Sequence, residues 1–493
     1  MGYQMEKPVN LLDILDMFGE DKVEVVDAPG SFGQVRVKSN ITVTNPPESL
    51  LDWCEDKLVL PNPDYEKKLR MGFWTGNTPK TLALYETHGA SVILPYGVLD
   101  AIKPFVQGTH DIRSGFAQWP TIDYGGMGID LYPYQEKAVQ ALLNAKYGIL
   151  QSPAGSGKTQ MGIELIKRFR LPALWLTHTK DLLNQSKARA ARYMDEKLIG
   201  TITEGKVNIG RGVTFATVQT MSKLDLGRYA DMWAVVITDE VHHAVHVPTM
   251  MTRFGKVLNH LNAPYKFGLS ATMHRADGLI RAVTALIGPI VHTVPAEEIS
   301  GRIMKVSVVP VGTGAVMTDD CLKPDGTLDY AGMINVLCID TDRNRLIVET
   351  LKRHRDRPSI ILSERLDHLS DFIELLPEDM AERACLVSGK TKKDVRERAI
   401  EDMRTGRKDY LFATYALARE GLDVPRLEAL YMTTPARDEA VVIQSVGRVS
   451  RTHEGKQTPV VFDFVDAMPY CKRAFRDRCR FYRKLDAEFK EDV

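Results

Sequence analysis

Short apolar runs alternate with longer amphipathic segments from about Leu131 almost to the end of the chain. Each run has the length and the flanking residues of a buried strand, and most are followed by a segment with helical period, such as DLLNQSKARAARYM. The first series is YGIL, ALWLTH, VTFATV, AVVITDE and YKFGLSAT; the second starts near Lys305 with KVSVVPVG and continues with SIILSE, ACLVSG, YLFATYA, ALYMTTP and PVVFDFV. This alternation predicts the α/β class, with two mainly parallel sheets in tandem.

The chain before about Gly125 has a different pattern, with shorter apolar runs and turn signals such as NPP, PNP and GNTP. This pattern predicts a small α+β accessory domain, with the GGMG sequence at Gly125–Gly128 as a hinge. We therefore expect an accessory domain over residues 1–125 and two α/β domains over 126–300 and 301–493. A length of 493 residues suits about three domains of ordinary size.

Charge and cysteine content narrow the class of protein. Lysine plus arginine and aspartate plus glutamate both number 64, so the formal charge is zero and any surface for a polyanion must be local. The cysteines are scattered without metal-ligand spacing, which supports neither a disulfide framework nor a zinc site. The sequence has no leader pattern and no apolar stretch of about 18 residues, so we expect a soluble, cytoplasmic protein without a membrane partner.

The segment SPAGSGKTQ, from Ser152 to Gln160, joins the run YGIL to the helical pattern MGIELIKRF. Glycines let the backbone curl so that successive N–H groups point inward, and the helix that follows directs its positive end to the same place. In the pattern G-x-x-x-x-G-K-[ST] the lysine reaches the outer phosphates and the hydroxyl binds Mg2+. We predict a nucleotide site at Gly155, Ser156, Gly157, Lys158 and Thr159, with a merely flexible turn as the alternative.

An acidic pair follows a continuous apolar strand. Asp239 and Glu240 come directly after Val235–Thr238, at the edge of an open α/β sheet where ligands bind. Asp239 is suited to hold Mg2+ on the β- and γ-phosphates, and Glu240 to orient or deprotonate the attacking water. The alternative is a helix cap with a solvated neighbour.

The second α/β half contains the sequence VIQSVGRVSR. Its spacing places Gln444, Arg448 and Arg451 on one face of a helix, from which the arginines could reach a transferring phosphoryl group across a cleft. The alternative is a surface helix whose arginines form ordinary ion pairs.

The order SPAGSGKT, DEVH, SAT and QSVGRVSR resembles the superfamily 2 helicases and translocases, over about Leu131 to Phe464. LYPYQEKAV resembles the adenine-side segment with its Gln135, and LWLTHTKDLLNQ, TFATVQTM, SIILSE and ATYALAREGLDVP resemble motifs Ia, Ic, IV and V. The likeness is strongest to the UvsW and XPB group, because SATMHRADG has Arg275, Ala276 and Asp277 where XPB has Arg-Glu-Asp. The missing glutamate leaves two roles open for this element, strand separation through Arg275 or a loop that caps the next helix.

The resemblance implies two RecA-like domains with ATP and Mg2+ between them. One wall would carry Lys158, Thr159, Asp239 and Glu240, and the other Gly421, Asp423, Arg448 and Arg451. His242 would pair with Gln444 and, together with the SAT sequence, couple hydrolysis to domain movement. Thr217, Gln219 and Thr414 would contact the phosphodiester backbone; for each threonine, a hydroxyl that caps a turn is the alternative.

Two segments lie outside this core. The tail YCKRAFRDRCRFYRKL predicts a helix that docks through the stripe Cys471, Phe475, Cys479 and Tyr482, with an outer basic face that could contact a phosphate backbone. In the N-terminal region, Lys67, Lys68 and Arg70 are interleaved with aromatic residues in LVLPNPDYEKKLRMGFWTG, a mixture suited to unpaired or junction nucleic acid. The alternative is that Phe73 and Trp74 form the core of the small domain.

Together these patterns predict an ATP-dependent helicase or translocase that acts on single-stranded or branched DNA in replication, recombination or repair. An RNA helicase is one alternative, because contacts with phosphates do not distinguish the sugar. An ATP-gated clamp or motor subunit of a restriction or defence complex is another. We expect a monomer, in a bacterial cell or a phage-infected host, with other replication, recombination or defence proteins as further partners.

Overall fold

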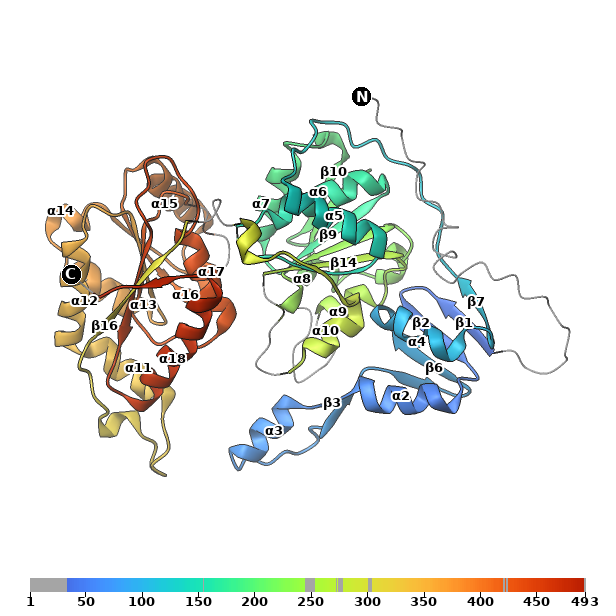
Figure 1. Ribbon diagram of the computed structural model, residues 1–493, viewed down its shortest axis with the longest axis horizontal. Helices are drawn as coiled ribbons and strands as arrows, with labels where there is room; N and C mark the ends of the chain where they lie inside the picture. The colour runs from blue at the N-terminus through green and yellow to red at the C-terminus, as the bar shows by residue number, and fades with distance from the viewer. Residues whose placement is uncertain are drawn as a thin grey trace, which may run out of the picture. The chain divides into compact units, whose positions relative to one another are not determined.

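The computed structural model describes residues 33–153, 155–243, 253–271, 273, 278–299, 304–419, 422 and 424–491 (Figure 1). The chain divides into two compact units, the first made of Met1–Pro153 with Gly157–Pro295 and the second of Ala154–Ser156 with Ala296–Val493. The expected α/β class and the tandem parallel sheets are confirmed. Among the described residues, no helix is long and apolar enough to cross a membrane.

The N-terminal part of the first unit is a small mixed sheet with its own core, as expected for an α+β region. Its strand order is β5-β6-β2-β1-β7, in which β1 pairs antiparallel with β2 and parallel with β7. Residues that alternate along β1 and β2, such as Val35 and Ile41, are buried beneath the two helices α2 and α4. The elements are β1 (Gly33–Val37), β2 (Asn40–Thr44), α2 (Glu48–Leu58), β5 (Glu86–His88), β6 (Ser91–Pro95), α4 (Leu99–Val106) and β7 (His110–Ser114).

The first α/β domain has an eight-stranded sheet in the order β11-β10-β12-β9-β13-β14-β8-β15. The five strands expected from the apolar runs are all present, whereas β10, β11 and β15 were not predicted. Figure 1 shows helices against both faces of the sheet. The strands are β8 (Gly148–Gln151), β9 (Ala173–Thr177), β10 (Ile199–Thr203), β11 (Lys206–Asn208), β12 (Val213–Thr217), β13 (Val235–Asp239), β14 (Tyr265–Ser270) and β15 (Ile290–Thr293); the helices are α5 (Pro133–Ala145), α6 (Lys158–Phe169), α7 (Lys180–Ala190), α8 (Val218–Met221), α9 (Arg253–Leu258) and α10 (Ile280–Ile287).

The second α/β domain has seven parallel strands in the order β18-β19-β17-β20-β21-β16-β22. Six of them coincide with the second series of apolar runs, and the short β22 was not predicted. The strands are β16 (Ser307–Gly312), β17 (Ser359–Ser363), β18 (Ala384–Val387), β19 (Tyr410–Thr414), β20 (Ala429–Met432), β21 (Val460–Val465) and β22 (Glu488–Phe489); the helices are α11 (Tyr330–Ile339), α12 (Thr341–Arg353), α13 (Leu366–Glu374), α14 (Glu378–Ala381), α15 (Lys393–Thr405), α16 (Tyr415–Arg419), α17 (Glu439–Val449) and α18 (Pro469–Lys484).

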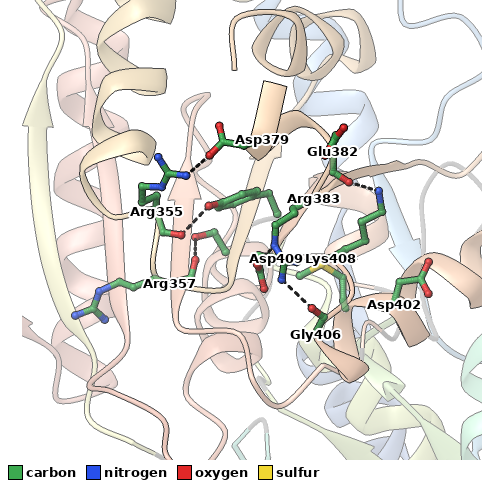
Figure 2. Close-up of polar contacts among 12 residues, drawn as sticks. Arg355, Arg357, Asp379, Glu382, Arg383, Asp402, Gly406, Lys408 and Asp409 are labelled. Atoms are coloured by element: carbon green, nitrogen blue, oxygen red, sulfur yellow. Dashed lines mark hydrogen bonds and ion pairs between the residues drawn. The ribbon is translucent and has the colours of Figure 1, made fainter. Parts of the chain in front are cut away.

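The loops that precede the strands of this second sheet are tied together by polar contacts (Figure 2). Arg355 binds Asp379, and its carbonyl accepts a bond of 2.6 Å from the Tyr410 hydroxyl. Arg383 pairs with Asp409 and donates a bond of 2.8 Å to the carbonyl of Gly406. Because these groups satisfy one another at the amino ends of the strands, we assign them a structural role.

Helix α18 docks on the second sheet through part of the stripe that we predicted. Its buried residues are Cys471, Ala474, Arg478 and Tyr482, whereas Phe475 and Cys479 are only partly covered. Arg478 forms a buried two-point ion pair with Asp463 of β21, at 2.6 and 2.8 Å. A guanidinium can turn inward here because Asp463 supplies a buried carboxylate, which the helical pattern alone does not reveal.

The GGMG segment, which we predicted as a hinge, is packed against the first α/β domain. Tyr124, directly before this segment, is hydrogen-bonded to the first α/β domain: its hydroxyl donates to the carbonyl of Leu171 at 2.7 Å. Gly126 has a φ of +72°, and a Cβ there would lie 2.4 Å from the carbonyl oxygen of Tyr193. The glycine is therefore required by close packing against the domain.

Candidate functional site

Three neighbouring strands of the first α/β domain bring the predicted nucleotide-binding and catalytic residues to one edge of the sheet. The strands β8, β14 and β13 are adjacent and parallel. The phosphate loop follows β8, Ser270 ends β14, and Asp239 ends β13. Since ligands bind at the carboxyl edge of open parallel sheets, this edge is the candidate site.

The loop after β8 has the backbone conformation that phosphate binding requires. Gly155 and Gly157 have φ angles of +82° and +84°, in the left-handed region. A Cβ at Gly157 would lie 2.4 Å from the amide nitrogen of Gln135, so the predicted adenine-side glutamine contacts the loop directly. Lys158, the first residue of α6, donates a bond of 3.1 Å to the carbonyl of Ser152. The unbonded N–H groups at a helix N-terminus, next to a lysine, fit a nucleotide phosphate.

The acidic pair lies two strands from this loop, and its Asp239 is shielded from water. Asp239 is buried, and burial together with the neighbouring Glu240 raises the pKa of its carboxyl group, while Lys158 opposes the rise. Glu240 has a φ of +50°, and its N–H donates to the Asp239 carboxylate at 3.0 Å. A buried carboxylate and the hydroxyl of Thr159 are oxygen ligands of the kind that Mg2+ prefers, so these residues fit a magnesium ion.

A short polar chain connects the acidic pair to the neighbouring strand. The Nδ1 of His242 lies 2.9 Å from the Ser270 hydroxyl and 3.4 Å from a carboxylate oxygen of Glu240. The structure therefore brings together His242 and the first residue of the SAT sequence, which were predicted to share a coupling role. A movement of the Glu240 carboxylate can therefore be transmitted to Ser270 of β14 through the side chain of His242.

Two candidate nucleic-acid residues of this domain lie at the carboxyl end of β12: Thr217 ends the strand, and Gln219 lies on α8, which follows it. Gln219 donates a hydrogen bond to the carbonyl of His178, which joins the segments predicted as motifs Ic and Ia. Thr217 is buried, and its hydroxyl bonds to that of Thr220 at 3.1 Å. The Thr217 hydroxyl therefore bonds neighbouring threonine side chains, and it makes no hydrogen bond that caps α8.

In the second domain, α17 carries only two of the three residues that were expected on one helical face. Gln444 and Arg448 lie on α17, four residues apart, whereas Arg451 follows the helix, which ends at Val449 with Ser450 as its cap. Arg448 donates to the carbonyls of Ala418 at 2.9 Å and Leu422 at 3.1 Å, so it fixes the segment predicted as motif V. Thr414 ends β19, next to Ser363 at the end of β17.

Three predicted site residues, Gly421, Asp423 and Arg275, lie outside the described residues. At the N-terminal candidate site, Lys67 and Arg70 are exposed, whereas Lys68 is held by Asp64 at 2.9 Å and Thr78 at 2.7 Å. Phe73 and Trp74 are 63% and 89% exposed, so the alternative that they form a core is wrong.

One residue with structural consequences was not noticed in the sequence. Lys266 is buried within β14, where its ammonium group bonds the carbonyls of Ser39 and Leu258 and lies 4.6 Å from the centre of the Tyr96 ring. The signal was a lone lysine inside the otherwise apolar run YKFGLS.

Two family models match the chain in tandem. The model for the type III restriction enzyme, res subunit, matches residues 128–275, and the helicase conserved C-terminal domain matches residues 342–453. The chain belongs to the superfamily 2 helicases. Both models fall on the α/β domains, so the helicase motifs and the parallel sheets coincide.

This helicase has relatives with both DNA and RNA in their names. It is 26% identical over 371 residues to a putative ATP-dependent RNA helicase of Acanthamoeba polyphaga mimivirus, covering 72% of this chain and 68% of the relative. It is 24% identical over 355 residues to the DNA 3'-5' translocase XPB2 of Sulfurisphaera tokodaii, covering 66% of this chain and 79% of the relative.

Solved structures share the fold of this helicase. Dbp5 of S. cerevisiae bound to RNA and ADP BeF3 matches with a TM-score of 0.50 at 18% identity, covering 81% of this chain and 94% of that one. The ATP-dependent type ISP restriction-modification enzyme LlaBIII bound to DNA matches with a TM-score of 0.53 at 15% identity, covering 74% and 31%.

Proposed function

We propose that this helicase hydrolyses Mg2+-ATP to move along DNA, and that it remodels forked or branched DNA. The observation that carries the motor assignment is the meeting of Lys158, Asp239 with Glu240, and Ser270 at the carboxyl edge of β8, β14 and β13. Helicase families hydrolyse ATP with Mg2+, which supports the same assignment.

Each residue of this edge receives a role that its chemistry supports. Lys158 neutralises the outer phosphates, while Thr159 and Asp239 hold the magnesium ion. Bound Mg2+-ATP supplies a γ-phosphoryl group for transfer to water. Glu240 accepts the proton of that water, and its contact with His242 passes the change toward Ser270.

In the second domain, Arg448 and Arg451 are proposed to stabilise charge on the phosphoryl group, with Gly421 and Asp423 lining the same wall. Gln444 is proposed to pair with His242. The amide oxygen of Gln444 is buried without a hydrogen-bond partner among the described residues, which supports a partner supplied during the ATP cycle.

DNA is favoured over RNA as the substrate on two grounds. Several relatives of the XPB type, among them that of Sulfurisphaera tokodaii, are named as DNA translocases or DNA helicases. In addition, the N-terminal sheet domain presents exposed Lys67 and Arg70, outside both matched regions. A second contact of this kind is what a branched substrate requires.

The test is a comparison of ATPase rates with single-stranded DNA, duplex DNA, a branched junction and RNA of matched sequence, followed by a strand-displacement assay. We expect the junction to give the highest stimulation and the protein to separate its strands. Greater stimulation by RNA would overturn the DNA assignment. Hydrolysis on DNA without strand separation would favour a clamp or a pure translocase.

A further inference from the structure

A hairpin with a helix at its end projects from the N-terminal sheet domain. We call residues 59–83 the arm: β3 (Val59–Pro61) pairs antiparallel with β4 (Thr81–Ala83), and α3 (Pro63–Arg70) lies between them. Asn62, which is buried, accepts a bond from the N–H of Asp64 at 3.0 Å and donates to the carbonyl of Pro79 at 2.8 Å. These bonds close the neck of the arm, so its outer part has a defined shape.

The base of the arm is fixed to the first α/β domain. Leu60 and Leu82 are buried in the same apolar cluster as Phe254 and Leu279 of that domain. Arg281 of α10 also donates to the carbonyl of Lys57, directly before the arm, at 2.9 Å. Because its base shares the core of the motor domain, the arm moves with that domain.

The outer part of the arm is apolar where it meets solvent. α3 has no buried residue, and Leu69, Phe73 and Trp74 are 63%, 63% and 89% exposed. The Phe73 N–H bonds the carbonyl of Lys68 at 2.9 Å, and Gly76 lies beside the Trp74 ring, where an added Cβ would be 3.2 Å from it. The two aromatic rings are therefore presented on an ordered turn.

Charges on the arm show which partner would cover these rings. The arm has four cations, Lys67, Lys68, Arg70 and Lys80, against the two carboxylates Asp64 and Glu66. Asp64 is occupied by Lys68, so the positive charge that remains is on exposed Lys67, Arg70 and Lys80. Exposed aromatic rings next to cations suit a single strand of nucleic acid, because the rings can stack on bases while the cations contact phosphates.

We propose that Trp74 and Phe73 stack on unpaired bases at the branch point of the DNA, while Lys67 and Arg70 contact the adjoining phosphates. This inference rests on the proposed function and names the residues that choose the branched substrate. The motor contacts phosphates without reading structure, and the arm adds a second contact at a fixed distance from it. A plain single strand that occupies only the motor does not need the arm.

The test uses the full chain without ATP and two probes, a fork with 2-aminopurine at its first unpaired position and a plain strand of the same sequence. Trp74→Ala with Phe73→Ala should weaken fork binding by about ten-fold or more, since each stacked base contributes strongly. Affinity for the plain strand should change less than about two-fold, which is below the contribution of one stacked base. Trp74→Phe, which keeps an aromatic ring, should retain most of the fork affinity.

A matched control is Met127→Ala, which also removes an exposed apolar side chain (69%) from the first unit. It should leave both affinities unchanged. Fork binding by the double alanine variant at the wild-type level, or an equal loss on fork and plain strand, would overturn the proposal. If DNA fails to stimulate the ATPase of the unaltered protein, the proposed function itself has failed, and this outcome is distinct because it requires no arm variant.

Discussion

The ammonium group of Lys266 donates a 3.0 Å hydrogen bond to the backbone carbonyl of Ser39, which lies 227 positions earlier in the chain. Ser39 belongs to the turn between β1 and β2, whereas Lys266 lies in β14, the strand that ends at Ser270. Tyr96 reinforces the contact, because its hydroxyl donates to the carbonyl of Pro264 at 2.6 Å. The N-terminal sheet is thereby joined to a central strand of the motor domain.

The first prediction follows from the burial of Lys266, which lowers the pKa of its ammonium group to about 7. A lysine in an unfolded chain has a pKa near ~10.4. Between these values the unfolded state binds a proton that the native state lacks, so this group makes stability rise with pH, by up to about 1.4 kcal/mol per unit. Lys266→Met should remove the rise. The melting temperature of the wild type minus that of the variant should therefore increase from pH 7 to pH 9.

Lys256→Met is the matched control for this comparison. Lys256 also donates to a carbonyl, that of Ser222, but the residue is exposed. The difference in melting temperature between the wild type and Lys256→Met should stay constant over the same pH range. A constant difference for Lys266→Met as well would mean that Lys266 keeps its charge in the folded protein.

The second prediction concerns the acidic pair. Glu240→Gln keeps the shape of the side chain but removes the proton acceptor, so turnover should fall by about 100-fold or more while ATP still binds. Lys158→Ala should lose hydrolysis through weaker phosphate binding instead. Single-turnover hydrolysis and binding of a fluorescent ATP analogue separate the two effects. Glu196→Gln, an exposed carboxylate of the same domain, is the control, and near-normal turnover in Glu240→Gln would assign the base to another residue.

The third prediction separates the two arginines of the second domain. Arg448 bonds the carbonyls of Ala418 and Leu422, whereas Arg451 lies beyond the end of α17. Arg448→Ala should therefore lower both turnover and the melting temperature, and Arg451→Ala should lower turnover. For an arginine that acts on transition-state charge, the loss in turnover should exceed about 100-fold. If both variants lose ATP affinity while kcat stays unchanged, the arginines do not have this role.

Much of the fold could be predicted because buried parallel strands are continuous apolar runs. Every run in the two series formed a strand, and the phosphate loop follows β8 as its glycines required. Short edge strands such as β11 and β22 have no such signal, since exposed residues are not constrained to be apolar. The helical period placed Arg451 on α17, but the period does not show where a helix ends.

The burial of charged groups could not be predicted for a different reason. A lysine or arginine goes inside only when carbonyls or a carboxylate from distant parts of the chain surround it. Lys266 meets Ser39 and Leu258, and Arg478 meets Asp463, contacts that exist only after the chain has folded. The helical period therefore left Arg478 outside the predicted apolar stripe.

The last prediction tests that buried pair. Arg478 and Asp463 are almost completely inaccessible, and the Tyr482 hydroxyl donates to the same carboxylate at 2.7 Å. Arg478→Met leaves Asp463 charged and without its cation, which should destabilise the second domain by about 3–5 kcal/mol. Arg476→Met, on the exposed side of α18, should change stability by less than ~0.5 kcal/mol. Adding Asp463→Leu to Arg478→Met should restore part of the loss, because the buried charge is then removed as well. Thermal unfolding of the three variants measures these differences, and an Arg478→Met protein as stable as Arg476→Met would show that α18 docks through its apolar residues alone.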